Sequence, residues 1–390
     1  MTNRFRRAAT ALAATGLGVL LAGTTVTTAA AATPPSWETQ ALGLDAAHTI
    51  AQGDGITVAV LDSGVQANHP VLSGRVTTGP DFFNDGLQPG DPHWGAHGTE
   101  MASDVLKVAP QAKILSVRVL DDSDDHQGQQ RENNPLANGI NYAVDHGANV
   151  ISMSLGGELW GNYNEDEVEA LARAANKGIP VIASAGNEGQ EFNDASFPAG
   201  YAGVIAVAAT QKNGSRADFS TVRTYNSVAA PGVDITSAKN TGGFTTSTGT
   251  SPAAALTSGV VALMLSHNHQ LTPAQVRQIL TSTAHHPSGG RNPLVGAGVI
   301  NAVAAVQGAT NPPADQTTPT TYTGTKYPAG TDSTPRTQHP PIPMAEMTVA
   351  YCVAAVGLLM IAAAVLVGTR ARKRAKTAPQ NPSAFTALSP

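Results

Sequence analysis

The sequence predicts an α/β fold in which a mainly parallel sheet carries helices on both faces. Three features of residues 53–309 support this class. Short runs rich in β-branched residues are bounded by Gly, Asp or Pro, as buried strands are. Segments with helical spacing lie between these runs, and such alternation builds parallel sheets. Residues 247–264 are apolar on all sides, which is typical of a helix buried in the core of one large domain.

The expected elements follow one another in a regular order. Five short runs are predicted to be strands, at 56–61, 113–120, 150–155, 179–183 and 204–209. Helical spacing predicts two helices between them, at 135–146 and 164–177. The second has Asn164 as its N-cap, Glu167 three residues later and Gly178 just past its end. In such folds the functional residues gather at the carboxyl ends of the strands.

The N-terminal part has the composition of an export signal. Residues 1–32 contain three arginines, then an apolar run and small residues up to Ala32, which is typical of a secretory signal peptide. A short N-terminal extension, 33–52, would then precede the large domain, 53–309. After that domain, residues 310–346 are rich in Pro and Thr and are expected to form an extended linker.

Residues 347–368 form an apolar run without a charge and are predicted to be a C-terminal transmembrane helix. At about 1.5 Å per residue the run is about 33 Å long, enough for a bilayer core of about 30 Å. The tail, 369–390, begins with several Lys and Arg residues. The positive-inside rule puts this tail in the cytoplasm and the large domain outside the cell membrane. The alternative, a core helix, is disfavoured by the length, position and basic flank of the run.

Charge and cysteine content limit the remaining possibilities. The formal net charge of −5 argues against nucleic acid as a partner. Cys352 is the only cysteine, so no intrachain disulfide can form.

Ser251 lies where the apolar helix is expected to begin. Pro252 suits a first helical turn, because its missing N–H costs nothing there. The N–H groups at a helix start stabilise negative charge, and a serine that attacks a carbonyl group creates an oxyanion close to its own N–H. A simple helix cap would explain this stretch equally well, so a nucleophile here needs a base and an orienting acid elsewhere.

Three other polar residues stand at comparable positions. Asp62 closes the strand 56–61, His97 lies in a Gly-Thr turn that leads into a helical segment, and Asn187 follows the strand 179–183. Each has an ordinary structural explanation as a turn former or cap. Their shared position at strand ends and helix starts suggests one site.

Seven short motifs resemble, in order, those of the subtilisin-like serine proteases. They are VAVLDSGV, HGTEMA, ISMSLGG, ASAGNEG, FPA, AAPGVDI and GTSPAA. The resemblance covers about residues 40–305 and implies the subtilisin-like three-layer α/β fold. It also implies a serine endopeptidase with the chain order Asp, His, Ser that subtilisin is known for.

The resemblance implies a role for each candidate residue. Ser251 would be the nucleophile, His97 the general base, and Asp62 the carboxylate that orients His97. Asn187 would donate to the oxyanion together with the Ser251 N–H. An extended polypeptide substrate would pair with Ser154, Leu155 and Gly156. The wall of the pocket for the residue before the cleaved bond would consist of Ala183, Ser184, Ala185 and Gly186.

Some residues depart from the family pattern. Pro252, Ala255 and Leu256 follow the serine where the family usually has other residues, and Glu100 and Ser103 replace a hydrophobic residue or histidine and a glycine. The loop that holds a strong calcium ion in many relatives looks absent, so no metal and no cofactor are expected. The acidic run Asp121, Asp122, Asp124 and Asp125 could bind calcium weakly, but solvated surface carboxylates are the favoured interpretation. A zinc site at His93 and His97 is disfavoured because the Glu of HExxH is missing.

The layout of the chain resembles the mycosins, membrane-anchored subtilases associated with type VII secretion. It combines a signal peptide, too few residues for a folded prosegment, a Pro-rich stalk and a C-terminal membrane helix. The sequence therefore predicts a membrane-anchored, extracytoplasmic endopeptidase that cleaves exported or cell-surface polypeptides, with type VII secretion machinery as a partner. The alternatives are an inactive subtilase-fold scaffold of a secretion complex and an ester hydrolase. The strand expected to bind an extended peptide favours peptide bonds over esters.

Overall fold

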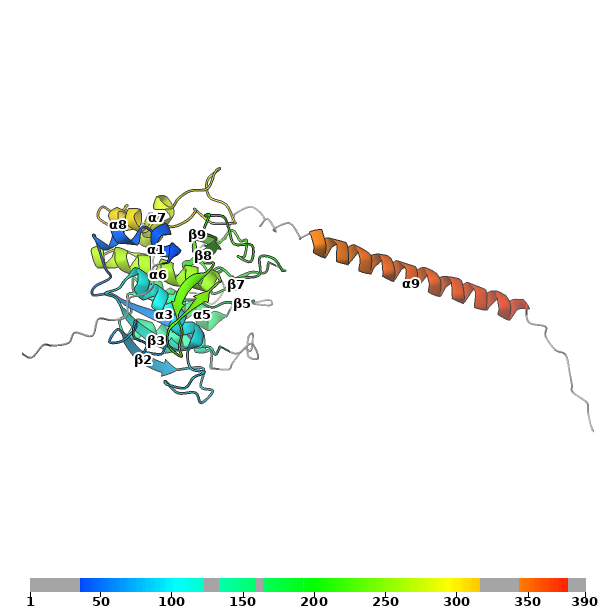
Figure 1. Ribbon diagram of the computed structural model, residues 1–390, viewed down its shortest axis with the longest axis horizontal. Coiled ribbons are helices and arrows are strands. Elements are labelled where there is room, and N and C mark those ends of the chain that lie inside the picture. Colours follow the sequence, from blue (N-terminus) through cyan, green and yellow to red (C-terminus); the bar gives the residue numbers. More distant parts are fainter. Residues whose placement is uncertain (1–35, 123–132, 159–163, 192, 316–343, 378–390) are drawn as a thin grey trace, which may run out of the picture.

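The computed structural model describes residues 36–122, 133–158, 164–191, 193–315 and 344–377 (Figure 1). The predicted signal peptide, most of the Pro/Thr-rich linker and the end of the basic tail lie outside the described residues. So do Asp124 and Asp125 of the acidic run.

Seven parallel strands form the central sheet in the order β2-β3-β1-β4-β6-β8-β9. Their bounds are β1 Thr57–Asp62, β2 Val76–Asp81, β3 Lys113–Arg118, β4 Val150–Met153, β6 Val181–Ser184, β8 Val204–Thr210 and β9 Asn226–Pro231. All five predicted strands are confirmed, with ends that differ by at most two residues. The sequence did not predict β2, which is a partly exposed edge strand that contains Gly79 and Pro80, or β9, which ends in Pro231.

Helices cover both faces of the sheet, as predicted. Successive residues of a strand point to opposite faces, so Val58 and Val60 join the core under α3 (Ala96–Val108) and α6 (Thr250–His267). Ala59 and Leu61 join the core under α4 (Pro135–Asp145) and α5 (Glu165–Asn176). The predicted helices 135–146 and 164–177 are α4 and α5, and the Asn164 side chain accepts the Glu167 N–H as the expected N-cap. The remaining helices of this domain are α7 (Pro273–Thr283) and α8 (Ala302–Gly308).

The apolar segment around Ser251 is the buried helix α6, which packs against α3 and several strands of the sheet. The helix begins at Thr250, so Ser251 lies inside its first turn rather than just before it. The HGT segment is also helical: α3 begins at Ala96, and His97 is its second residue instead of part of a preceding turn.

The described part of the N-terminal extension packs into the domain. Its helices are α1 (Trp37–Ala41) and α2 (Leu44–His48), and the side chains of Glu38, Leu42 and Leu44 are buried. Glu38 contacts Lys107, near the last residue of α3. Ten residues of helix, about 15 Å, separate Lys107 from His97. Residues 36–52 therefore pack at the end of α3 away from His97.

Two small antiparallel pairs complete the domain. One is the hairpin β10 (Ile235–Ala238) and β11 (Phe244–Ser247), which packs on α3 and leads into α6. The other pairs β5 (Gly157–Glu158) with β7 (Ser196–Phe197).

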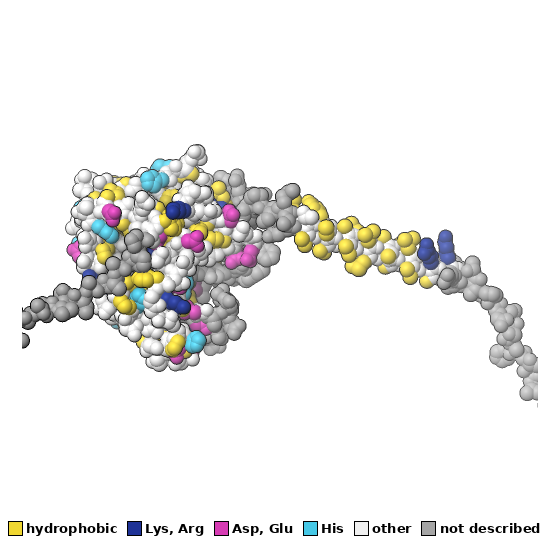
Figure 2. All heavy atoms as spheres, in the orientation of Figure 1, with side chains coloured by type: hydrophobic (Ala, Val, Ile, Leu, Met, Phe, Trp, Pro, Cys, Tyr) yellow, Lys and Arg dark blue, Asp and Glu magenta, His cyan; other side chains and the backbone are white. Residues whose placement is uncertain are grey.

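A long helix, α9 (Met344–Thr377), follows the domain and extends away from it (Figure 1). Its segment Met347–Lys373 is, within the described ranges, the one helix whose length and apolar composition would allow it to cross a membrane. The apolar side chains cover its surface and are exposed, and Lys and Arg gather at its far end (Figure 2).

Candidate active site

Asp62 and His97 meet at the carboxyl end of β1. Asp62 is fully buried, and its Oδ1 lies 2.8 Å from His97 Nδ1. A carboxylate can only accept, so Nδ1 carries the hydrogen and the Nε2 of the neutral ring is left as an acceptor. The N–H of Ser63 donates to the same Oδ1 at 2.7 Å and fixes the carboxylate.

Gly98 allows α3 to approach the turn after Asp62. A Cβ at position 98 would lie 2.0 Å from the carbonyl oxygen of Gly64, which is a severe overlap. Any larger residue would push the helix, and His97 with it, away from Asp62. The sequence suggested a turn for this Gly-Thr pair, but the glycine serves close packing inside the helix.

Charge around His97 changes its pKa. Burial disfavours the charged ring, but the negative charge and hydrogen bond of Asp62 outweigh this effect, with further contributions from Asp122 and Glu100. The pKa of His97 is thereby raised from 6.5 to about 9. The ring keeps 32% of its side-chain surface exposed, so a substrate can reach it.

The hydroxyl of Ser251 lies at the start of α6 beside the end of β4. Ser251 Oγ donates to the carbonyl oxygen of Ser154 at 3.0 Å, and Ser154 Oγ donates back to the Ser251 carbonyl oxygen at 2.9 Å. No hydrogen bond joins Ser251 to His97 among the described residues. Such bonds are often long or misaligned before a substrate binds.

Asn187 and the Ser251 N–H lie close to each other beside Gly249. Asn187 Oδ1 accepts from the N–H and the hydroxyl of Thr250, at 2.9 and 3.0 Å, so its Nδ2 points elsewhere as a donor. A Cβ built on Gly249 would lie 3.6 Å from both Asn187 Nδ2 and Ser251 N. Pro252 Cδ lies 3.7 Å from the same point, so the two nitrogen donors lie close to one position beside Gly249, as a pair of oxyanion donors would.

The two predicted substrate segments lie side by side. Residues 154–156 follow β4, and residues 183–186 comprise the last two residues of the neighbouring strand β6 and the two residues after it. The Ser184 hydroxyl joins the segments by donating to the Leu155 carbonyl oxygen at 3.1 Å. Ala183 and Ala185 are fully buried and support this wall from inside the protein.

Ser196 and Tyr225 complete this region, and neither residue was predicted from the sequence. The Ser196 side chain packs between both segments: its Oγ lies 2.1 Å from where a Cβ on Gly156 would be, and its Cβ lies 2.9 Å from a Cβ on Gly186. The Tyr225 hydroxyl accepts the Ser196 N–H at 2.9 Å and donates to the Ala185 carbonyl oxygen at 3.2 Å. The FPA motif next to Ser196 was the only indication in the sequence.

Metal ligands are not assembled in the described part of the chain. No group of three or more His, Cys, Asp or Glu side chains that could hold an ion occurs there. His93 precedes α3, so it does not share a helix with His97. Asp122 is more than a solvated carboxylate, because it accepts from the N–H groups of Ala96 and His97.

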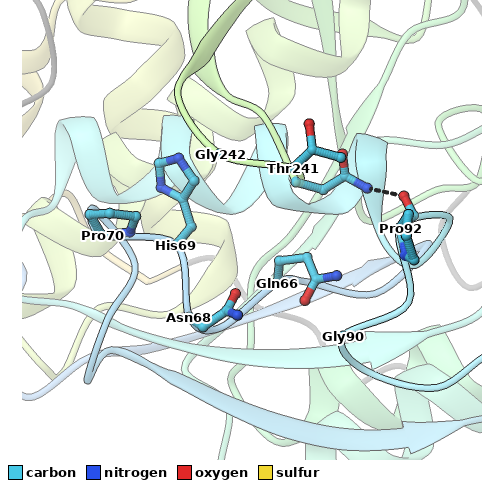
Figure 3. A pocket seen from close by; sticks show the side chains of 9 residues that line it. Gln66, Asn68, His69, Pro70, Gly90, Pro92, Thr241 and Gly242 are labelled. Atoms are coloured by element: carbon cyan, nitrogen blue, oxygen red, sulfur yellow. Dashed lines mark hydrogen bonds between the residues drawn. The ribbon is translucent and has the colours of Figure 1, made fainter.

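A groove of about 400 Å³ lies elsewhere, along the loop after β1 and the β10–β11 turn (Figure 3). His69 lines it and contacts the Gly243 carbonyl oxygen through Nε2 at 2.9 Å. None of the predicted site residues lines this groove.

Comparison with known proteins identifies the family of the chain. The Subtilase family model (Peptidase_S8) matches residues 53–317. Thermitase from Thermoactinomyces vulgaris is 38% identical over 271 residues, which cover 67% of this chain and 92% of thermitase. Subtilisin E from Bacillus subtilis (strain 168) is 36% identical over 266 residues, covering 65% of this chain and 66% of that protein.

Solved structures show the same fold. MycP1 from Mycobacterium smegmatis aligns with a TM-score of 0.59 at 29% identity, over 69% of this chain and 84% of MycP1. The MycP3 protease from the type VII (ESX-3) secretion system aligns with a TM-score of 0.60 at 29% identity, over 70% and 88% of the two chains. The chain belongs to the subtilase family and is a serine-type endopeptidase.

Proposed function

We propose that Ser251, His97 and Asp62 form the catalytic triad of an endopeptidase that is anchored in the cell membrane and acts outside the cytoplasm. The observation that carries this proposal is the 2.8 Å contact between Asp62 and His97. This contact lies at the same edge of the sheet as Asn187 Nδ2 and the Ser251 N–H, which both lie close to Gly249. The proposed substrates of this endopeptidase are exported or cell-surface polypeptides.

The proposed reaction proceeds through an acyl-enzyme. The Ser251 hydroxyl turns from the Ser154 carbonyl oxygen to His97 Nε2, which takes its proton as Oγ attacks the substrate carbonyl carbon. Asn187 Nδ2 and the Ser251 N–H stabilise the oxyanion. His97 then protonates the leaving amine, and water hydrolyses the ester in the same way. Asp62 stays ionised and stabilises the imidazolium in both halves of the reaction.

The contact of Ser196 with Gly156 and Gly186 supports a short pocket for the side chain before the cleaved bond. We expect wild type to prefer Ala or Ser at this substrate position, and Ser196→Gly to gain roughly tenfold in kcat/KM for Leu or Phe, because one or two more methylenes can then be buried. Matched fluorogenic peptides that differ only at this position measure the ratio. An unchanged ratio of Leu to Ala substrates would mean that Ser196 does not limit the pocket.

The raised pKa of His97 predicts an alkaline pH profile. Only the neutral ring can act as the base, and a pKa of about 9 leaves a small neutral fraction at pH 7. We expect kcat/KM to rise with pH well above 6.5, to reach half of its plateau near pH 9 and to level off about one pH unit higher. Initial rates with one peptide between pH 5 and 10.5 provide the test, and a profile that levels off below pH 7 would contradict the raised pKa.

Anchoring and secretion partners belong to the same proposal. The exposed apolar surface of α9 and the basic residues at its end support one membrane crossing with a cytoplasmic tail. The fold similarity to MycP1, described as an essential component of the type VII (ESX-1) secretion system, supports type VII machinery as a partner.

A fluorophosphonate probe tests the activity on the full chain in detergent. Labelling of wild type, but not of Ser251→Ala, together with cleavage of an unfolded protein substrate, is the expected result. If folded wild type is as unlabelled as Ser251→Ala across pH 7 to 10, the chain is instead an inactive scaffold with a subtilase fold. If wild type is labelled and hydrolyses esters but cleaves no peptide, the protein is an ester hydrolase instead.

A further inference from the structure

The N-terminus of α3, the helix that carries His97, is capped by a side chain from another segment of the chain. Its N-cap residue, Gly95, has no side chain, so the free N–H groups of the first turn need other partners. The carboxylate of Asp122 accepts from Ala96 N–H at 2.6 Å through Oδ2 and from His97 N–H at 3.2 Å through Oδ1. The backbone of the candidate base is therefore held by a side chain 25 residues further along the chain.

Two neighbouring hydrogen bonds connect this region to the strands around Asp62. Ser63, which follows Asp62, accepts the Gly98 N–H through its hydroxyl at 3.0 Å. Val119, three residues before Asp122, donates its N–H to the Asp62 carbonyl oxygen at 2.8 Å. Hydrogen bonds thus connect the N-terminus of α3 to the segments that follow β1 and β3. The same two segments also position the carboxylate of Asp62.

Asp122 also adds charge. The carboxylates that face His97 are Asp62 from β1, Asp122 from beyond β3, and Glu100 from its own helix. A negative group at a helix N-terminus is favourable, and it stabilises a nearby imidazolium. Of these three residues, Asp122 alone combines a charge with hydrogen bonds to the backbone of α3.

We propose that Asp122 is a positioning residue of the protease, which holds the start of α3 so that His97 faces Asp62 and which stabilises the charged ring during the reaction. This role rests on the proposed function of the triad. Each carboxylate oxygen of Asp122 accepts one backbone N–H of α3.

Two substitutions separate position from charge. Asp122→Asn keeps an acceptor oxygen for the helix and removes the charge, whereas Asp122→Ala removes both. Asp45→Asn is the matched control, because Asp45 is an exposed carboxylate in the first turn of α2. Each variant is made in the full chain, and kcat and kcat/KM are measured with one peptide over the whole pH range.

We expect Asp122→Asn to move the acid limb of the kcat/KM profile down by about half to one pH unit, less at high salt. Asp122→Ala should show the same shift and also lose about tenfold in kcat on the alkaline plateau, because a small displacement of the base is costly. Asp45→Asn should match wild type. If Asp122→Ala does not fold, the shift of the acid limb in Asp122→Asn alone tests the role of Asp122.

An NMR titration of the His97 ring in the Ser251→Ala background reads the same effect without activity. A lower pKa of His97 in Asp122→Asn than in Asp45→Asn is expected. The role of Asp122 would be overturned if its variants kept the acid limb and the plateau of the wild-type pH profile and if the pKa of His97 did not change. Absence of fluorophosphonate labelling in wild type would overturn the protease proposal instead, and the titration would still report on Asp122.

Discussion

Replacing Ser251 with alanine should reduce kcat by roughly 10⁶-fold while leaving the fold and substrate binding intact. This is the magnitude measured for loss of the nucleophile in subtilisin, a member of the same family. The Ser251 hydroxyl donates one hydrogen bond, to the Ser154 carbonyl oxygen. Removal of this hydroxyl should therefore disturb the surrounding structure little. Steady-state cleavage of one peptide, with enzyme above the micromolar range for the variant, measures the loss. A loss below tenfold would show that another nucleophile carries the reaction.

Asn187 gives a second measure of the same site. Loss of one oxyanion donor costs roughly 10²- to 10³-fold in kcat, which is the expectation for Asn187→Ala. Asn187→Asp keeps the Oδ1 acceptor that holds Thr250, replaces the donor and adds a negative charge beside the oxyanion, so its loss should be at least as large. Both variants should leave KM within a few-fold of wild type. Equal activity of wild type and Asn187→Asp would place the oxyanion elsewhere.

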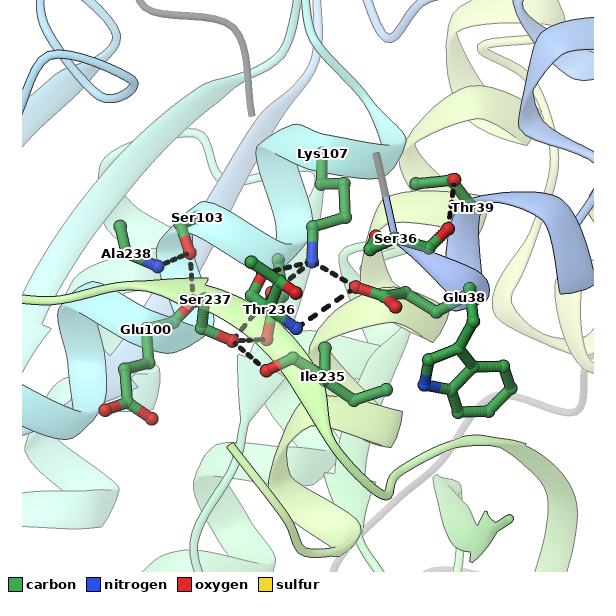
Figure 4. Close-up of polar contacts among 12 residues, drawn as sticks. Ser36, Glu38, Thr39, Glu100, Ser103, Lys107, Ile235, Thr236, Ser237 and Ala238 are labelled. Atoms are coloured by element: carbon green, nitrogen blue, oxygen red, sulfur yellow. Dashed lines mark hydrogen bonds and ion pairs between the residues drawn. The ribbon is translucent and has the colours of Figure 1, made fainter. Parts of the chain in front are cut away.

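Lys107→Met should destabilise the domain by about 3–5 kcal/mol at pH 7, the range found when one member of a buried ion pair is removed. Lys107 Nζ donates to Glu38 Oε1 at 2.6 Å, to Asp104 Oδ1 at 3.1 Å and to the Thr236 carbonyl oxygen (Figure 4). Both carboxylates are fully buried and would lose their cation. Denaturant unfolding of wild type and variant measures the difference in free energy.

The pH dependence of this loss has a definite sign. Burial already raises the pKa of Asp104 to about 6, above its value in the unfolded chain. Without Lys107 the pKa of Asp104 should rise further, so the penalty for burying its charge begins to shrink as the pH falls below the folded pKa and is gone below the unfolded pKa. The destabilisation should therefore shrink from pH 7 to pH 4. Lys177→Met, at an exposed lysine beyond α5, should have little effect at either pH.

The same cluster gives the N-terminal extension a role in stability. Trimming the chain to about Ala51 would remove Glu38, α1 and α2 and expose Lys107, so it should weaken the fold. A trimmed protein that is as stable as wild type and more active would contradict this view.

The sequence by itself determined the class of the fold and the positions of the catalytic candidates. Buried parallel strands are short apolar runs, and α6 is apolar on all sides, so burial leaves a local pattern that needs no knowledge of the partners. Asp62, Asn187 and Ser251 stand at the ends of such runs, and the sheet geometry then brings them to one edge.

Tertiary structure alone decided the contacts that tune the site. Ser196 packs between the two predicted substrate segments and Asp122 caps α3 because distant segments pack together. The FPA motif marks the segment beside Ser196, but the neighbours of these two residues along the chain do not encode their contacts. The edge strand β2 and the hairpin β10–β11 lack a strong apolar pattern for the same reason, since their pairing and their contact with α3 define them. Local sequence records how deeply a residue is buried, whereas the partner of a polar side chain is fixed only when the chain has folded.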